Sequence, residues 1–134
     1  MEVHNSKSLS RRMKRLFAPK TCMVLGTAEG SGADYARKFA AKDCTIVFMD
    51  IDKERGYQLK EELERDYAAR VFFFHGDLYA EDEVDIFLKA VKQQFKRVHY
   101  CFCNCWNWPY QGMLNNLLIK EATVQCIHPM RLYK

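Results

Sequence analysis

The stretch Thr-Cys-Met-Val-Leu-Gly-Thr-Ala-Glu-Gly-Ser-Gly, residues 21–32, decides how this chain folds. Its first five residues are apolar or β-branched, which predicts a buried parallel strand over residues 21–25. A G-x-x-x-G-x-G pattern follows at Gly26, Gly30 and Gly32. The first glycine permits a sharp turn, the second lets a ligand approach the backbone closely, and the third lets a helix pack tightly on the strand.

The residues after this turn predict a helix, a second strand and a terminal acid. Small and apolar side chains recur at helical spacing over residues 31–41, and the N–H groups at the start of such a helix suit a phosphate. Residues 44–49 form a second apolar run, which Asp50 closes. A carboxylate at that point can accept hydrogen bonds from both hydroxyls of an adenosine ribose. The pattern predicts a dinucleotide-binding unit; the alternative is a tightly turned βαβ unit that binds no ligand.

The same residues predict NAD rather than NADP as the dinucleotide. Asp50 would repel a 2′-phosphate, and neither the glycine turn nor the position after Asp50 carries Arg or Lys. Glu29 lies inside the turn, where a carboxylate is unfavourable beside a pyrophosphate unless it points outward.

The remainder of the chain continues the alternation of strands and helices. Apolar runs predict strands over residues 71–75 and 98–103, and helical spacing predicts helices over 53–68, capped by Asp52, and 81–95, with an acidic first turn. This order predicts an α/β fold, with one domain over residues 21–134 and helices on both faces of a parallel sheet of about four strands. The fourth strand is expected at an edge of the sheet. Together with a last helix over about 114–123, that edge would favour self-association.

The motifs resemble those of the short-chain dehydrogenase/reductase family, over the N-terminal half of its fold. Family members carry T-G-x-x-x-G-x-G after the first strand, and here Leu25 replaces the leading Thr. The resemblance implies an incomplete three-layer Rossmann-type sheet with strand order 3-2-1-4. It also implies that Asp77 contacts the adenine ring, and that Asn104, the first residue of an otherwise lost Asn-Asn-Ala-Gly motif, supports the end of the fourth strand. The cofactor-binding residues implied by the resemblance and the glycine pattern are Gly26, Ala28, Glu29, Gly30, Ser31, Gly32, Asp50, Asp77, Leu78 and Asn104.

This chain departs from the family pattern at the residues that surround the nicotinamide and at those that carry out catalysis. Trp106 stands where the family usually has Ala, so we expect it to crowd the nicotinamide half of the cofactor. In the family a Tyr exchanges a proton with the substrate oxygen and a Lys lowers the pKa of that Tyr. That Tyr-x-x-x-Lys pair and its Ser have no counterpart before Lys134, so no catalytic residue is assigned.

Several interpretations of the whole chain stay open at this point. The first is the cofactor-binding part of an oxidoreductase whose chain is truncated. The others are a non-catalytic nucleotide-binding or interaction module, a decayed fragment and, less favoured, a methyltransferase that uses S-adenosylmethionine. Methyltransferases usually carry an acid just before the first glycine, where this chain has Met23, Val24 and Leu25.

Composition and charge disfavour other classes. The 134-residue chain is 49% hydrophobic but has no apolar stretch near 18 residues, so no membrane span is predicted. Residues 1–20 form a basic arm, interpreted as a solvated segment rather than one that binds a membrane or nucleic acid. Its basic side chains, set against Glu2 alone, are Lys7, Arg11, Arg12, Lys14, Arg15 and Lys20. The lack of a signal-peptide pattern indicates a cytoplasmic protein with reduced thiols.

Three cysteines alternate along the fourth predicted strand. The side chains of Cys101, Cys103 and Cys105 therefore share one face. Thiolates bind zinc and iron–sulfur clusters, but the usual C-x₂-C spacing is absent here. We interpret these residues as buried thiols and predict no metal site.

Overall fold

The fold was analysed in a computed structural model that describes residues 20–26, 30–95, 97–103, 108–114 and 125–127. Strands and helices alternate along these residues, as the sequence predicts. Their order is β1 (Thr21–Leu25), α2 (Ser31–Ala40), β2 (Thr45–Asp50), α3 (Lys53–Tyr67), β3 (Val71–His75), α4 (Glu81–Gln94), β4 (Tyr100–Cys103), α5 (Gln111–Leu114) and β5 (Gln125–Ile127). The predicted α/β class is confirmed.

The strands form one parallel sheet in the order β3-β2-β1-β4-β5. The predicted order 3-2-1-4 is confirmed, but the expectation that the fourth strand lies at an edge is wrong. β5 pairs with β4 in the register Tyr100↔Gln125, Cys101↔Cys126 and Phe102↔Ile127. A strand of three residues is too short to show an apolar run or an alternation, so the sequence carried no signal for it.

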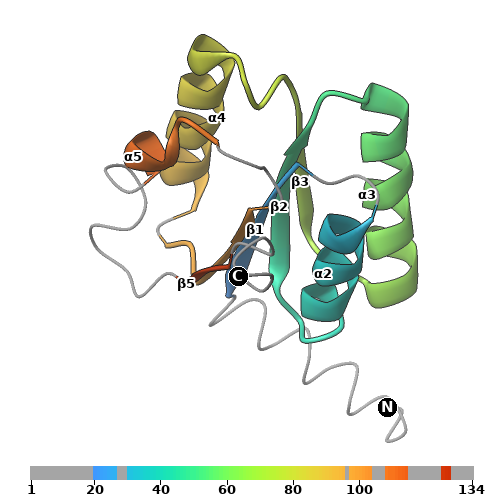
Figure 1. Ribbon diagram of the computed structural model, residues 1–134. Coiled ribbons are helices and arrows are strands. Elements are labelled where there is room, and N and C mark those ends of the chain that lie inside the picture. Colours follow the sequence, from blue (N-terminus) through green and yellow to red (C-terminus); the bar gives the residue numbers. More distant parts are fainter. Residues whose placement is uncertain (1–19, 27–29, 96, 104–107, 115–124, 128–134) are drawn as a thin grey trace, which may run out of the picture.

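Helices cover both faces of the sheet, as Figure 1 shows. α2 and α3 lie against one face, and α4 and α5 lie against the other. Alternate side chains of β1 point to opposite faces, so that Cys22 and Val24 join the apolar core under α2 and α3, whereas Met23 and Leu25 join the core under α4. Both faces of β1 and β2 are buried, so their side chains are almost all apolar. Each strand therefore appears in the sequence as an apolar run.

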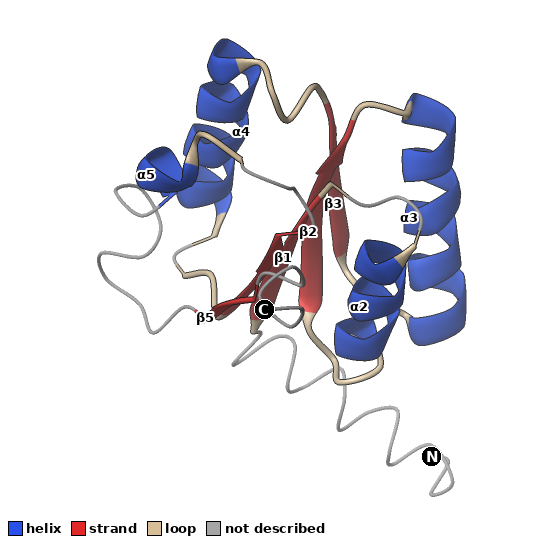
Figure 2. Cartoon of the chain, viewed as in Figure 1, coloured by secondary structure: helices blue, strands red, loops and turns tan. Residues whose placement is uncertain are grey.

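The sequence predicts the ends of α2, α3 and α4 to within one residue. The predicted cap of α3 is present, because the Asp52 carboxylate accepts a hydrogen bond from the Arg55 N–H at 3.1 Å. Ala68 ends the same helix in the left-handed conformation, with φ 52°. In the cartoon of Figure 2, the loops that leave the carboxyl ends of β2 and β3 lie at the same end of the sheet.

β4 begins at Tyr100, two residues later than predicted. The reason lies in His99, which hydrogen-bonds to β1 through both its backbone and its side chain. The His99 N–H donates to the Thr21 carbonyl at 2.8 Å, and the Thr21 N–H donates to His99 Nδ1 at 2.9 Å. A side-chain nitrogen thus replaces the backbone acceptor that a longer β4 would have supplied.

Two predicted segments lie outside the described residues. They are the basic arm, apart from Lys20, and the last helix over 114–123, apart from Leu114. The division into an arm and a domain therefore stays a prediction. No helix in the described ranges has both the length and the apolar character needed to cross a membrane.

Candidate functional site

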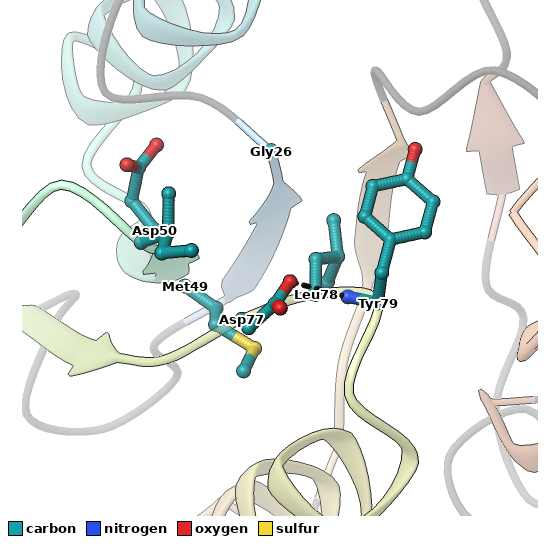
Figure 3. A pocket seen from close by; sticks show the side chains of 7 residues that line it. Gly26, Met49, Asp50, Asp77, Leu78 and Tyr79 are labelled. Atoms are coloured by element: carbon teal, nitrogen blue, oxygen red, sulfur yellow. Dashed lines mark hydrogen bonds between the residues drawn. The ribbon is translucent and has the colours of Figure 1, made fainter.

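A pocket of about 150 Å³ lies at the carboxyl ends of β1, β2 and β3. In open parallel sheets this is the edge at which ligands bind. Figure 3 shows Asp50 and Tyr79 on opposite sides of the pocket, with Gly26 at the end of β1 between them. Four of the predicted cofactor-binding residues meet here, and the full lining is Gly26, Met49, Asp50, Ile51, Asp77, Leu78 and Tyr79. Pockets for whole drug-sized ligands exceed about 300 Å³, so this one suits a part of a larger ligand.

The glycine turn has the backbone conformation that its glycines predict. Gly26 has φ 80° and Gly30 has φ 73°, both in the left-handed region. A Cβ atom on Gly30 would meet no atom within 4 Å. Gly30 is therefore required for its backbone angle, and the open space beside it leaves room for a ligand to approach.

Helix α2 starts directly after this turn. Gly30 occupies its N-cap and has no side chain with which to cap the helix. Ser31 begins the helix, and Gly32 is buried in its first turn, in keeping with close packing on the sheet. The N–H groups of a first helical turn, together with the helix dipole, suit an anionic group. Ala28 and Glu29 lie outside the described residues.

Asp50 is the last residue of β2 and is held from both sides. Its carboxylate Oδ1 accepts a hydrogen bond from the Asp52 N–H at 2.8 Å, and its carbonyl accepts one from the Gly76 N–H at 3.0 Å. The bond to Asp52 orients the Asp50 carboxylate at the pocket.

Asp77 shapes the loop between β3 and α4. Its carboxylate accepts a hydrogen bond from the Tyr79 N–H at 2.8 Å (Figure 3), and its carbonyl accepts one from the Ala80 N–H at 3.1 Å. The Asp77 N–H donates to Glu83 Oε1 at 3.2 Å. Sequence reasoning missed Glu83, although its place in the acidic first turn of α4 allows its side chain to reach back past the helix start.

Two aromatic residues after β4 contact the same loop, and no sequence pattern indicates these contacts. Trp108 Nε1 donates a hydrogen bond to the Leu78 carbonyl at 2.8 Å, and the Tyr110 hydroxyl donates one to the Tyr79 carbonyl at 3.1 Å. Sequence reasoning also missed Met49, Ile51 and Tyr79 as lining residues. Asn104 and Trp106 lie outside the described residues.

Four cysteines are buried and form no disulfide bond: Cys22, Cys44, Cys101 and Cys103. Cys101 and Cys103 share the face of β4 that packs against α4, as their alternation predicts, whereas Cys22 and Cys44 lie in the opposite core. Burial, with Cys44 nearby, raises the pKa of the Cys22 thiol and keeps it neutral. Within the described ranges, no three side chains of His, Cys, Asp or Glu form a group that could hold a metal ion. Cys105 lies outside those ranges.

Known sequences resemble this chain over the same region. The family model for short chain dehydrogenases matches residues 20–125. Short-chain dehydrogenase reductase 3b of Arabidopsis thaliana is 26% identical over 85 residues, which cover 63% of this chain and 32% of the relative. The chain thus spans about a third of the length of that curated relative.

Solved structures share the fold at lower identity. L-sorbose reductase from Gluconobacter frateurii, complexed with NADPH and L-sorbose, superposes with a TM-score of 0.62 at 21% identity, covering 66% of this chain and 34% of that one. An alcohol dehydrogenase from the archaeon Thermococcus sibiricus, complexed with 5-hydroxy-NADP, gives 0.59 at 24% identity, with 62% and 35% covered. NAD⁺-bound xylitol dehydrogenase gives 0.58 at 19% identity, with 62% and 32% covered.

The family match and the geometry agree. The match begins at the residue before β1 and ends at the first residue of β5, so it takes in β1 to β4, the glycine turn and the pocket. It decides against the methyltransferase alternative. Since the family model matches most of its length, this chain belongs to the short chain dehydrogenase family.

Proposed function

We propose that this chain binds the adenosine half of a NAD-type dinucleotide, as the cofactor-binding part of a short-chain oxidoreductase. One observation carries the proposal. The glycine turn, the acid at the end of β2 and the Asp-Leu pair after β3 lie far apart in the sequence, yet Gly26, Asp50, Asp77 and Leu78 line a single pocket.

Each part of the pocket suits a different part of that ligand. The Asp50 carboxylate would accept hydrogen bonds from the ribose hydroxyls, and Leu78 and Ile51 offer apolar surface to the adenine ring. The start of α2, next to the left-handed Gly30, would receive the pyrophosphate. The Asp77 carboxylate accepts a hydrogen bond from the Tyr79 N–H. Asp77 would therefore both hold the loop in place and face the adenine ring.

The preference for NAD over NADP rests on charge. A 2′-phosphate would lie beside the Asp50 carboxylate, which repels it. The Arg55 guanidinium, which follows in α3, pairs with Asp52 at 3.4 Å. Among structures of similar fold, both NADPH-bound and NAD⁺-bound proteins occur, so the preference is argued from this chain's own residues.

A bound dinucleotide supplies hydride chemistry, whereas the protein must supply proton transfer at the substrate. We assign that role to no residue in the described ranges. We further propose a cytoplasmic location, supported by Cys22 and Cys44, which are buried and form no disulfide bond. Fractionation of cells that express the tagged protein would test this, and recovery from the medium or an oxidising compartment would contradict it.

The first prediction concerns Asp50. We expect NADH to bind saturably and more tightly than NADPH, and Asp50→Asn to weaken NADH binding about 10- to 100-fold, because hydrogen bonds to a charged group contribute about 1.5–3 kcal/mol. Binding is followed by energy transfer from tryptophan to the reduced nicotinamide, and by calorimetry with ADP-ribose.

The matched control is Glu64→Gln, which also removes one carboxylate but on α3, where Glu64 pairs with Lys60 at 2.7 Å. It should leave NADH affinity unchanged. S-adenosylmethionine is the ligand control and should not bind. A folded protein that shows no saturable NADH binding would overturn the proposed function, and tighter binding of NADPH would overturn the cofactor preference.

A further inference from the structure

Trp108 and Tyr110 follow β4 in the chain but reach back to the loop between β3 and α4. Trp108 Nε1 donates to the Leu78 carbonyl at 2.8 Å, and the Tyr110 hydroxyl donates to the Tyr79 carbonyl at 3.1 Å. The two rings meet edge to face, with centroids 6.1 Å apart. Two consecutive carbonyls of one loop are thus held by one aromatic pair.

The bond from Trp108 is anchored in the core. Only 8% of Trp108 is exposed, and its ring packs in the apolar cluster that also contains Leu78, Phe87 and Cys103. A buried indole N–H needs a partner, and the Leu78 carbonyl supplies it. The bond from Tyr110 is exposed, so its contribution should be smaller.

These bonds act differently from the loop's own. The bonds from the Tyr79 and Ala80 N–H groups to Asp77, and from Asp77 to Glu83, shape the turn locally. They do not determine where the turn lies relative to the sheet. The bonds from Trp108 and Tyr110 join residues 30 and 31 positions apart, and so tie the loop to the segment after β4.

The loop between β3 and α4 forms one wall of the pocket. Asp77, Leu78 and Tyr79 line it opposite Asp50, which is the last residue of β2 (Figure 3). The distance between these walls therefore depends on where the loop after β3 lies. Any displacement of that loop changes the width of the pocket without breaking a strand pairing.

We propose that Trp108 and Tyr110 are positioning residues, which hold the loop of Asp77, Leu78 and Tyr79 at the spacing from Asp50 that adenosine requires. This inference rests on the proposed function. By thermodynamic reciprocity, an adenosine ligand in the pocket strengthens the bonds from Trp108 and Tyr110 as much as those bonds strengthen its binding.

The test combines a measurement without ligand and one with ligand. Hydrogen exchange is first measured on the ligand-free protein for the amides of Tyr79 and Ala80. Trp108→Phe keeps an aromatic ring in the core and removes the N–H, and we expect it to speed exchange at these two amides about tenfold or more. Amides in β1 and β2 should keep their wild-type rates.

The affinities of ADP-ribose and of nicotinamide mononucleotide are then measured on the same variants. We expect Trp108→Phe to weaken ADP-ribose about five- to tenfold, and Tyr110→Phe about two- to threefold. Binding of nicotinamide mononucleotide should not change. A double-mutant cycle should show coupling between Trp108→Phe and Asp77→Asn, because Trp108 holds the loop that contains Asp77.

Two control variants separate positioning from general loss of stability. Val98→Ala removes volume from the same apolar cluster, but at the residues before β4, so it should lower the stability of the protein and leave ADP-ribose affinity unchanged. Tyr57→Phe removes a hydroxyl from α3, where Tyr57 packs edge-on against Phe73 and does not line the pocket. It should change neither measurement.

Each contrary outcome has a distinct meaning. If wild-type protein binds ADP-ribose and Trp108→Phe binds it equally well, the inference is overturned and the proposed function stands. Unchanged exchange at Tyr79 and Ala80 in Trp108→Phe overturns it too. If wild-type protein is folded, with the expected exchange pattern, but binds no adenosine ligand, the proposed function fails and the inference about the pocket fails with it.

Discussion

A single glycine in α3 shows how closely this helix approaches the sheet. A Cβ atom on Gly56 would lie 2.0 Å from Phe73 Cζ, far inside van der Waals contact. The Phe73 ring cannot turn away at little cost, because it stacks on Phe48 with centroids 4.8 Å apart and meets the edge of Tyr57 at 5.1 Å. Close packing between α3 and β3 therefore depends on this residue having no side chain.

Gly56→Ala should destabilise the protein, although alanine is the better helix former by about 1 kcal/mol. The clash with Phe73 should cost about 3 kcal/mol, the upper end of the usual range for overpacking of a core, and so more than offset that gain. Gly112→Ala in α5 is the matched control, because a Cβ there meets no atom within 4 Å. Urea unfolding measures both, and a Gly56→Ala protein at least as stable as wild type would refute this account.

At the scale of elements, His99 links the start of β1 to the segment before β4. The Thr21 N–H donates to His99 Nδ1, which must be unprotonated to accept it. Burial lowers the pKa of His99, and the nearby positive charges of Arg97 and Lys20 lower it further. All three effects, the hydrogen bond included, favour the neutral ring in the folded state.

The sign of the resulting pH dependence follows from linkage. Because the pKa of His99 is lower in the folded than in the unfolded state, its contribution to stability is complete above the ordinary histidine pKa, about 6.5. It is lost as the pH falls from there through the folded-state pKa. The free energy of unfolding should thus decrease between pH 7.5 and 5.5.

His99→Asn is the variant that tests this, since an amide oxygen can accept the Thr21 N–H without titrating. We expect it to flatten the fall in stability over this pH window, as measured by urea unfolding at each pH. If the variant loses as much stability as wild type between pH 7.5 and 5.5, His99 is not the group responsible.

At the scale of the whole molecule, the proposed ligand should report on folding. A ligand that binds only the folded state at 100 times its Kd adds about 2.7 kcal/mol of stability, which for a domain of this size raises Tm by roughly 10 °C. NADH at that ratio should produce such a rise, and the same NADH concentration should raise the Tm of Asp50→Asn much less. A Tm that does not respond to saturating NADH would contradict binding to the folded protein.

Much of this molecule could be predicted from contiguous sequence. The apolar runs predicted β1 and β3 to the residue. β1 is buried along its whole length, and strands buried in a parallel sheet have few polar positions. Asp52 predicted the start of α3, and the glycine pattern predicted the left-handed turn before α2. The position of Asp50 at a strand end predicted its place in the pocket. Periodicity, caps and turns are properties of neighbouring residues, so a linear sequence displays them.

Only the tertiary structure decided which distant residues meet. It placed β5 beside β4, the His99 ring against Thr21, the Phe73 ring against Gly56, and Trp108 under the loop of Leu78. None of these contacts leaves a periodic trace, because each depends on how strands and helices pack across the sheet rather than on the spacing of side chains along one element. The sequence alone therefore determined the strands and helices from β1 to β4 and one wall of the pocket, at Asp50. Tertiary packing determined how far the opposite wall lies from it.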